Sequence, residues 1–268
     1  MKLLLLFSFA ALLAAHDLYL MPQKFRTTPG EKILLSVHTG DSFPASEHAV
    51  DPARLRAWPA LPETSWRMLG KATHTTLTTA AQSQMLAVAT APRLLEMAPE
   101  KFLSYLLEEG LESVALDRKA KGETALPGRE RYSKYAKTYV HSGPGTSGYD
   151  QPLGLRIEFV PQADPATLRP GQDFPILLLS EGKPLANAQV LLAISADAKA
   201  KTAYTVAGRT DAQGRLSIKL ASAGKMRLHA IEMRRVAEPT HDWESFWASF
   251  TFEVAPGAPD ASSVVSSR

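Results

Sequence analysis

The histidines are the residues of this chain with the clearest capacity for chemistry. Seven of them occur among 268 residues, and the chain has no cysteine. They are His16, His38, His48, His74, His141, His229 and His241. Imidazole binds Ni, Cu, Co and Zn, whereas the lack of cysteine excludes disulfides, thiolate metal sites, iron–sulfur clusters and cysteine nucleophiles. The histidines do not form an HExxH motif, which excludes a zincin-type protease.

The other common catalytic motifs are missing. There is no GxSxG nucleophile motif, no P-loop and no GxGxxG motif. The acidic residues near the histidines show no spacing typical of a glycosidase pair. These acids are Asp41, Glu47, Asp51, Asp242 and Glu244. We therefore predict that the protein is not an enzyme.

The first fifteen residues have the layout of a secretory signal peptide. A positive start, Met1-Lys2, precedes an apolar run over 3–13 and the small pair Ala14-Ala15. A membrane-spanning helix needs about 20 apolar residues, so this run is short for one. We predict cleavage after Ala15 and a periplasmic mature protein, with an uncleaved membrane anchor as the alternative.

Cleavage after Ala15 would make His16 the first residue of the mature chain. A free α-amine and an imidazole on one residue form a bidentate chelate, which suits Cu or Ni. A cut one residue away would remove this chelate and leave His16 as an ordinary polar residue. The sequence therefore offers two readings of His16, as a metal ligand or as a surface side chain.

Short strand-like segments separated by Gly, Pro and Asp turns predict a mainly β protein. We expect two antiparallel β-sandwich domains of the Ig-like or prealbumin-like kind, with a short helical insertion near 99–121. The predicted N-terminal sandwich covers 16–160 and the predicted C-terminal one covers 168–254. The remainder, 255–268, is rich in Pro, Ser and Ala and is predicted to be disordered.

The helical insertion is predicted from a change in spacing. Pro99 suits the first helical position, an apolar stripe with helical spacing follows, and Gly110 interrupts it. A second helical spacing occurs at Tyr132, Tyr135, Ala136 and Tyr139, among arginines and lysines. Interleaved aromatic and basic residues can bind single-stranded nucleic acid. Here the net charge is only +3 and the charges are dispersed, so packing is the favoured reading and no nucleic-acid partner is expected.

Several blocks of the sequence resemble one family. They occur in the family's order over about 16–254, nearly the whole predicted mature chain. They include AHDLYLMPQKFRTTPGEKILLSVHTGDSFPASE, PEKFLSYLLEEGLESV, GRERYSKYAKTYV, RTDAQGRLSIKL and DWESFWASFTFEV. The chain is identified by these blocks as a member of the DUF4198 family.

The resemblance implies a function. The DUF4198 family is labelled a periplasmic component associated with nickel or cobalt uptake, with an older label of glycoside-hydrolase family 25. The barrel fold of that hydrolase does not match the antiparallel strand pattern here. His16 matches the family's histidine at the start of the mature chain, which strengthens its assignment as a metal ligand.

We choose the remaining ligands from the predicted strands. His38 is the first choice, because its strand is expected beside the N-terminal strand, and His229 is the next. The expected cofactor or cargo is a divalent metal, Ni, Co or Cu, bound reversibly by imidazole with an affinity that falls below about pH 6.

Two functional classes remain open at this point. The leading one is an accessory protein that captures the metal and passes it to an ABC- or ECF-type metal transporter in the inner membrane. The rival is a cell-surface interaction or carbohydrate-binding module that binds no metal. A copper-dependent oxidative enzyme is a third and weaker reading.

Overall fold

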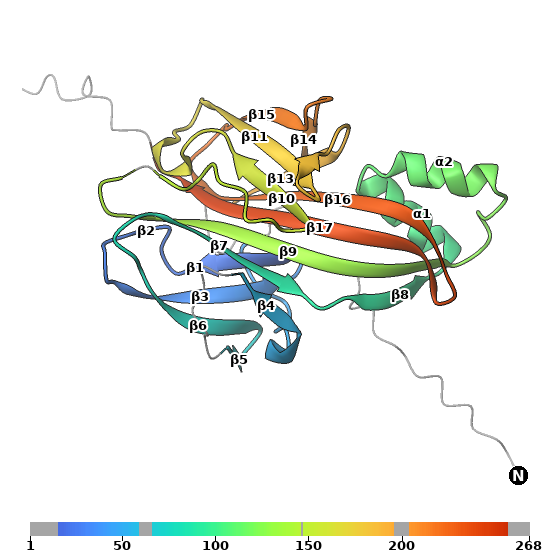
Figure 1. Ribbon diagram of the computed structural model, residues 1–268, viewed down its shortest axis with the longest axis horizontal. Coiled ribbons are helices and arrows are strands. Elements are labelled where there is room, and N and C mark those ends of the chain that lie inside the picture. The colour runs from blue at the N-terminus through green and yellow to red at the C-terminus, as the bar shows by residue number, and fades with distance from the viewer. Residues whose placement is uncertain (1–15, 59–65, 146, 196–203, 257–268) are drawn as a thin grey trace, which may run out of the picture.

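The computed structural model describes residues 16–58, 66–145, 147–195 and 204–256. This described chain is mainly β with two short helices (Figure 1), which confirms the predicted class. The predicted signal peptide at 1–15 and the last twelve residues of the predicted disordered tail, 257–268, lie outside the described residues. Within the described segments, no helix combines the length and apolarity needed to span a lipid bilayer.

A mixed sheet of nine strands runs through the middle of the molecule. Its order is β14-β13-β16-β17-β9-β7-β4, and β2 and β8 also pair with β9. The long strands β9, β16 and β17 lie side by side along the molecule (Figure 1). The strands of this sheet are β2 Arg26–Thr27, β4 Leu55–Ala57, β7 Gln84–Thr90, β8 Arg93–Met97, β9 Gly128–Ser142, β13 Gln189–Ser195, β14 Thr205–Arg209, β16 Gly224–Glu238 and β17 His241–Val254.

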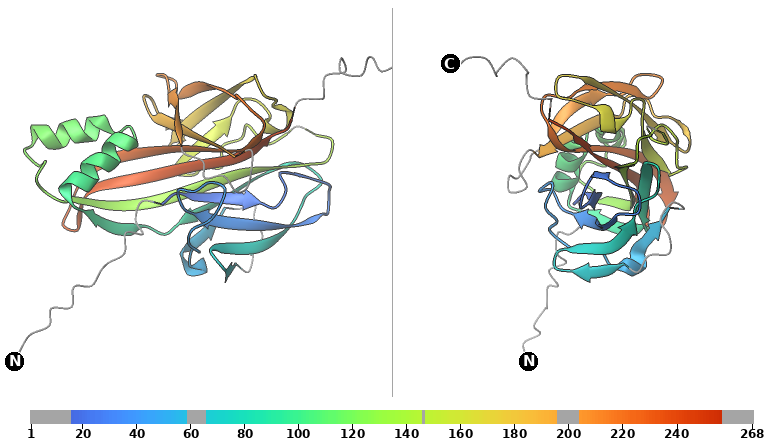
Figure 2. Two further views of the ribbon diagram at one scale, coloured as in Figure 1. Left: turned by 180° about the vertical axis from the view of Figure 1, so that it is seen from behind. Right: turned by 90° about the vertical axis from the view of Figure 1, so that its left-hand side faces the viewer.

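Two smaller sheets cover opposite faces of the central sheet (Figure 2). One has the order β1-β3-β6-β5, and the other has β10-β11-β12 with β15 paired to β11. The first consists of β1 Leu18–Pro22, β3 Lys32–Thr39, β5 Arg67–Leu69 and β6 Ala72–Thr78. The second consists of β10 Ile157–Pro161, β11 Asp173–Ser180, β12 Lys183–Pro184 and β15 Arg215–Lys219.

The two faces of the central sheet carry different cores because side chains alternate along a strand. On β17, Phe250 and Phe252 are buried against the second small sheet, in a core that also contains Phe174. Ser249 and Thr251, which alternate with these phenylalanines, point the other way, where their hydroxyls donate to carbonyl oxygens of β1. The alternation of Phe with Ser and Thr in this segment therefore places one strand in two packing layers.

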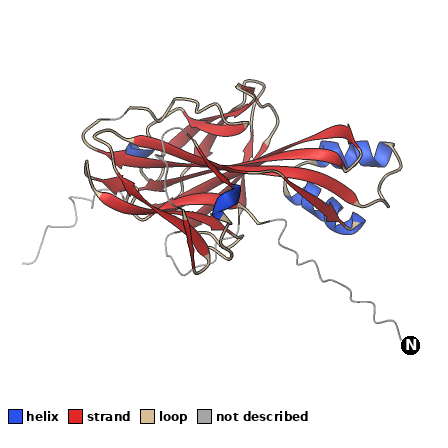
Figure 3. Ribbon diagram, turned by 60° about the horizontal axis from the view of Figure 1, so that its bottom comes forward, coloured by secondary structure: helices blue, strands red, loops and turns tan. Residues whose placement is uncertain are grey.

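The helical insertion is present where the spacing predicts it. Helix α1 spans Pro99–Glu108 and α2 spans Glu112–Ala120. Gly110 lies between them with a φ of 71°, a left-handed conformation that favours glycine. The helices pack on the far end of the long strands (Figure 3), in a core with Tyr132 and Trp247. Two single 3-10 turns, η1 Pro52–Arg54 and η2 Pro165–Thr167, complete the described helical structure.

The expectation of purely antiparallel sheets requires correction. Strand β9 pairs in parallel with β17 over nine residue pairs, and in parallel with β2. Parallel neighbours must come from separate parts of the chain, since no tight turn can connect them. The central sheet thus takes strands from both predicted domains, 16–160 and 168–254. In addition, Tyr135 and Tyr139, which have helical spacing with Tyr132, lie on strand β9.

A buried ion pair connects the central sheet to the second small sheet. Lys137 Nζ of β9 lies 2.7 Å from Glu158 Oε2 of β10, and both side chains are 1% exposed. The Glu158 carboxylate also accepts hydrogen bonds from the backbone N–H groups of Leu153, Gly154 and Leu155. Burial lowers the pKa of Lys137, and attraction to Glu158 acts against that shift.

We expect Lys137→Met to reduce the free energy of unfolding by about 3–5 kcal/mol, because it leaves the Glu158 carboxylate buried without its counter-charge. Urea unfolding followed by tryptophan fluorescence measures the change. The matched control is Lys32→Met, since Lys32 is exposed on β3. Equal stability of the two variants would contradict the structural role of the pair.

Candidate metal centre

His16 lies two residues before the first residue of strand β1, and two elements hold it in place. The ammonium of Lys134 on β9 donates to the backbone oxygen of His16. Strand β1 then pairs with β3 so that Leu18 is opposite Thr39, the last residue of β3. Because β3 ends there, the loop after Thr39 passes beside His16.

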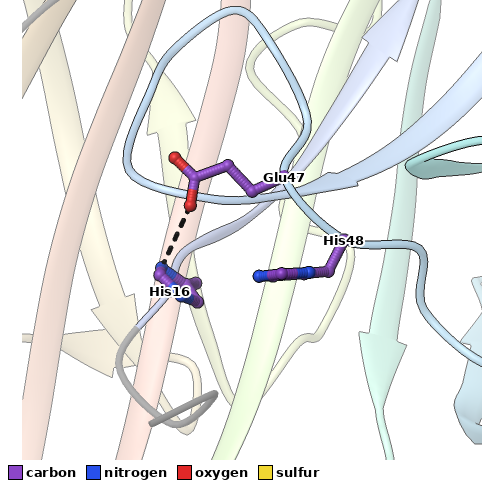
Figure 4. Close-up of side chains that lie close together, drawn as sticks. All are labelled: His16, Glu47 and His48. Carbon is purple, nitrogen blue, oxygen red and sulfur yellow. Dashed lines mark ion pairs between the residues drawn. The ribbon is translucent and has the colours of Figure 1, made fainter. Parts of the chain in front are cut away.

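That loop brings two possible metal ligands to His16. Thr39 forms an isolated bridge with His48, and the Glu47 N–H donates to the Thr39 oxygen at 2.7 Å. One ligand atom from each of His16, Glu47 and His48 lies within 4.8 Å of the others (Figure 4). These three residues are called the His16 group below.

The His16 group has a donor set that fits a divalent transition metal. Two imidazoles and one carboxylate are ligands that Ni, Co, Cu and Zn accept. His16 Nδ1 lies 3.6 Å from Glu47 Oε2 and 3.0 Å from Asp41 Oδ2. The His16 and His48 ring centroids are 5.4 Å apart. The possible ligand atoms therefore already face one another. An ion bound among them would replace the direct contacts of His16 with Glu47 and His48 by bonds to the metal.

Glycine is required where the loop passes Glu47. Gly40 has a φ of 149°, and a Cβ built there would lie 2.8 Å from Glu47 Cγ. Any side chain at this position would push the Glu47 carboxylate aside. That carboxylate has a lowered pKa, chiefly because the Ser42 hydroxyl bonds to it and also because it attracts the His16 ring. Glu47 is therefore held as an anion beside two imidazoles.

His38 lies outside the His16 group, although its strand is beside β1 as the sequence analysis expected. It is paired with Tyr19, and its Nδ1 lies 3.0 Å from the Pro44 oxygen. Burial lowers the pKa of His38 to about 4. The register explains its position, because His16 precedes β1 and lies beside the loop after β3 instead of beside residue 38.

His229 also lies outside the His16 group, in a buried ion cluster. Its Nδ1 is 2.9 Å from Asp17 Oδ1, and its Nε2 is 2.9 Å from Glu109 Oε2. Burial lowers the pKa of His229, but attraction to Asp17 and Glu109 outweighs it and raises the pKa to about 10. A carboxylate at each ring nitrogen and the raised pKa both favour the imidazolium, whose protonated nitrogens do not ligate a metal.

The buried ion cluster fixes the residue that follows His16. Asp17 is 3.2 Å from the Arg227 guanidinium and accepts a hydrogen bond from the Tyr204 hydroxyl. Burial alone would raise the pKa of Asp17, but attraction to His229 and Arg227 lowers it well below its ordinary value. The Arg227 guanidinium lies 4.4 Å from the centre of the Tyr19 ring. Asp17, Glu109, Arg227 and His229 thus join β1, the end of α1 and β16.

We expect the stability supplied by the His229 imidazolium to be complete below pH 6.5 and to disappear as the pH rises through about 10. The folded pKa lies above the unfolded one, so the folded state loses stability as that proton is released. Glu109→Gln removes the charge of one of the two carboxylates that face the ring, so it should lower the pKa of His229. The stability that the imidazolium supplies should then be lost at a lower pH than in wild type. NMR titration of the His229 ring measures the pKa directly.

Thermal melting at pH 6 and pH 10 gives a second measurement for this prediction. The difference in stability between wild type and Glu109→Gln should be larger at pH 6. Glu108→Gln is the control, since Glu108 faces Ser104 on the helix surface. An identical His229 titration in Glu109→Gln and wild type would show that Glu109 does not stabilise the imidazolium.

Comparison with protein families gives a match over most of the chain. A family model described as a domain of unknown function, DUF4198, matches residues 13–233. The chain belongs to the DUF4198 family. This confirms the resemblance found in the sequence. Among curated proteins, none matches this DUF4198 chain.

Solved structures similar to this DUF4198 protein are distant. Adhesin InvE of Yersinia pseudotuberculosis is 13% identical, with 88% of this chain and 58% of that one covered and a TM-score of 0.23. The Escherichia coli adhesin FdeC is 14% identical, with 89% and 64% covered and a TM-score of 0.22. Trypsin-activated alpha-2-macroglobulin of Escherichia coli is 11% identical, with 90% and 16% covered and a TM-score of 0.24. The DUF4198 chain covers less than two thirds of each structure, and TM-scores this low carry no functional argument.

Proposed function

We propose that this DUF4198 protein is an exported, periplasmic metal-binding protein that holds Ni, Co or Cu at the His16 group. Its partner would be an ABC- or ECF-type metal transporter in the inner membrane, to which it passes the ion. The observation that carries the proposal is the convergence of His16, Glu47 and His48 ligand atoms within 4.8 Å.

Signal-peptide cleavage would add a further donor to this group. If the mature chain begins at His16, its α-amine and Nδ1 belong to one residue and can chelate one ion. His48 would then supply the second imidazole and Glu47 the carboxylate. The anchoring of Asp17 in the buried ion cluster and the Lys134 bond to the His16 oxygen support this arrangement, because both restrict the residue that would carry the chelate.

The exposure of the ligands supports delivery of the ion instead of permanent retention. His48 is exposed, and the Glu47 side chain is 30% exposed. Structural metal sites are closed by four protein ligands, whereas open sites leave positions for water or an incoming ligand. An acceptor protein can therefore approach the ion. Imidazole must be neutral to bind, so protonation of the ligands would release the metal.

We expect His48→Ala and His16→Ala each to weaken Ni²⁺ binding to the mature protein by more than about 100-fold, since each removes a direct ligand. Isothermal titration calorimetry of tag-free protein measures this. His74→Ala is the control, because His74 bonds to Ser36 on β3 and should leave the affinity within about twofold of wild type. Unchanged affinity in His48→Ala would contradict the proposed centre, and no binding by wild type would favour a module without metal.

The N-terminal amine is tested separately. One residue added before His16 converts the amine into an amide, so Ni²⁺ and Cu²⁺ binding should weaken by at least about 10-fold while the fold is unchanged. Equal affinities of the extended and mature proteins would exclude the amine as a ligand. Mass spectrometry of a periplasmic extract checks the premise, and we expect a chain that starts at His16. An intact Met1 would contradict cleavage.

A further inference from the structure

A pocket of about 220 Å³ opens beside the His16 group. His16 and His48, two members of that group, also line the pocket. The pocket lies where η1, the end of β7, β8 and β9 meet the start of β1, and Tyr132 and Lys134 of β9 contribute to its wall. Sites for drug-sized ligands are roughly 300–1,000 Å³, so this space suits a smaller molecule. A molecule in it would lie close to two members of the His16 group.

The lining of this pocket is strongly basic. Arg54, Arg93 and Lys134 all line it, against a single carboxylate, that of Asp51. The Asp51 carboxylate accepts from the backbone N–H of Ala53 at the start of η1, so part of its hydrogen-bonding capacity is used there. Three cations around a small space favour an anionic ligand.

Neither arginine of the pocket has its charge balanced by direct contact with a carboxylate of the described chain. Among the described residues, neither Arg54 nor Arg93 makes a close ion pair; the Arg54 guanidinium donates to the Ala91 oxygen and is attracted by Asp51 at longer range. Burial lowers the pKa of Arg54, and repulsion from Arg93 lowers it further. Arg54 is half-buried and Arg93 is exposed, and an anion that bridges the two guanidinium groups would offset the repulsion between them. Guanidinium groups match carboxylates with two parallel hydrogen bonds.

The acidic residues beside His16 explain why a metal would matter. Asp41 and Glu47 lie beside His16, and their negative charges repel an anion that approaches the imidazoles. A divalent ion at the His16 group would reverse that local charge. An anion with several carboxylates could then bind the arginines at one end and the ion at the other.

We propose that this pocket binds a small polycarboxylate anion through Arg54, Arg93 and Lys134, and that the bound anion supplies ligands to the metal at the His16 group. The second part rests on the proposed function. The protein would then carry its metal as a ternary complex with a soluble chelator, with the open coordination positions filled by carboxylate oxygens.

Equilibrium dialysis with radiolabelled citrate tests this inference. The mature protein is used metal-free, and again after loading with one equivalent of Ni²⁺ and removal of the excess. We expect weak citrate retention by metal-free protein and at least about 10-fold tighter retention by nickel-loaded protein. Arg54→Ala and Arg93→Ala should each weaken citrate binding at least about 10-fold and leave Ni²⁺ binding without citrate within about twofold.

Arg56→Ala is the matched control, since Arg56 is exposed on β4 and its guanidinium bonds to nearby backbone oxygens. Failure of wild type to retain citrate, or full retention by both pocket variants, would overturn the anion site. Citrate that removes the nickel into the buffer, or that binds equally with and without nickel, would overturn the ternary complex. Failure of Ni²⁺ to bind when citrate is absent would instead count against the proposed function, and arginine-dependent citrate retention would still support the anion site.

Discussion

The arrangement of this protein depends on a charge that is buried at the junction of three elements. The His229 imidazolium has a carboxylate at each nitrogen, from Asp17 and Glu109, and Arg227 provides a second cation for Asp17. An ion in this position is costly to desolvate unless every partner is present. All the charges of the cluster are therefore paired only when the start of β1, the end of α1 and β16 are packed together as in the folded protein. The position of His16, one residue from Asp17, follows from this constraint.

Much of the fold was predictable because the relevant signals are local. Turn residues and alternating side chains indicate strands such as β11 and β13, and Pro99 and Gly110 mark the helical pair. The parallel pairing of β9 with β17 was not predictable in this way. It depends on which distant strands meet, and no local pattern encodes that choice. For the same reason, the helical spacing of the tyrosines in β9 gave no guide to their structure.

The candidate site was predictable only in part. His16 is distinguished by the expected cleavage position, and it belongs to the group that the structure brings together. Glu47 and His48 were visible as a loop pair after the predicted strand, and strand register would have favoured them over His38. The environment of His229 could not be foreseen, because its partner Glu109 comes from a helix far away in the sequence. A histidine in an apolar strand gives no sign of two buried carboxylates.

The shared central sheet has a consequence for how the molecule comes apart. The cores on its two faces use alternate residues of the same strands, as Leu86 and Val140 on one side and Met85 and Tyr139 on the other illustrate. If β7 or β9 separated from the sheet, both cores would lose buried side chains. Proteins built from separate domains can lose one domain while the other remains folded, but this architecture removes that option. We therefore expect the described chain to unfold in a single cooperative transition, so that a destabilising change on either face of the central sheet lowers the stability of both cores.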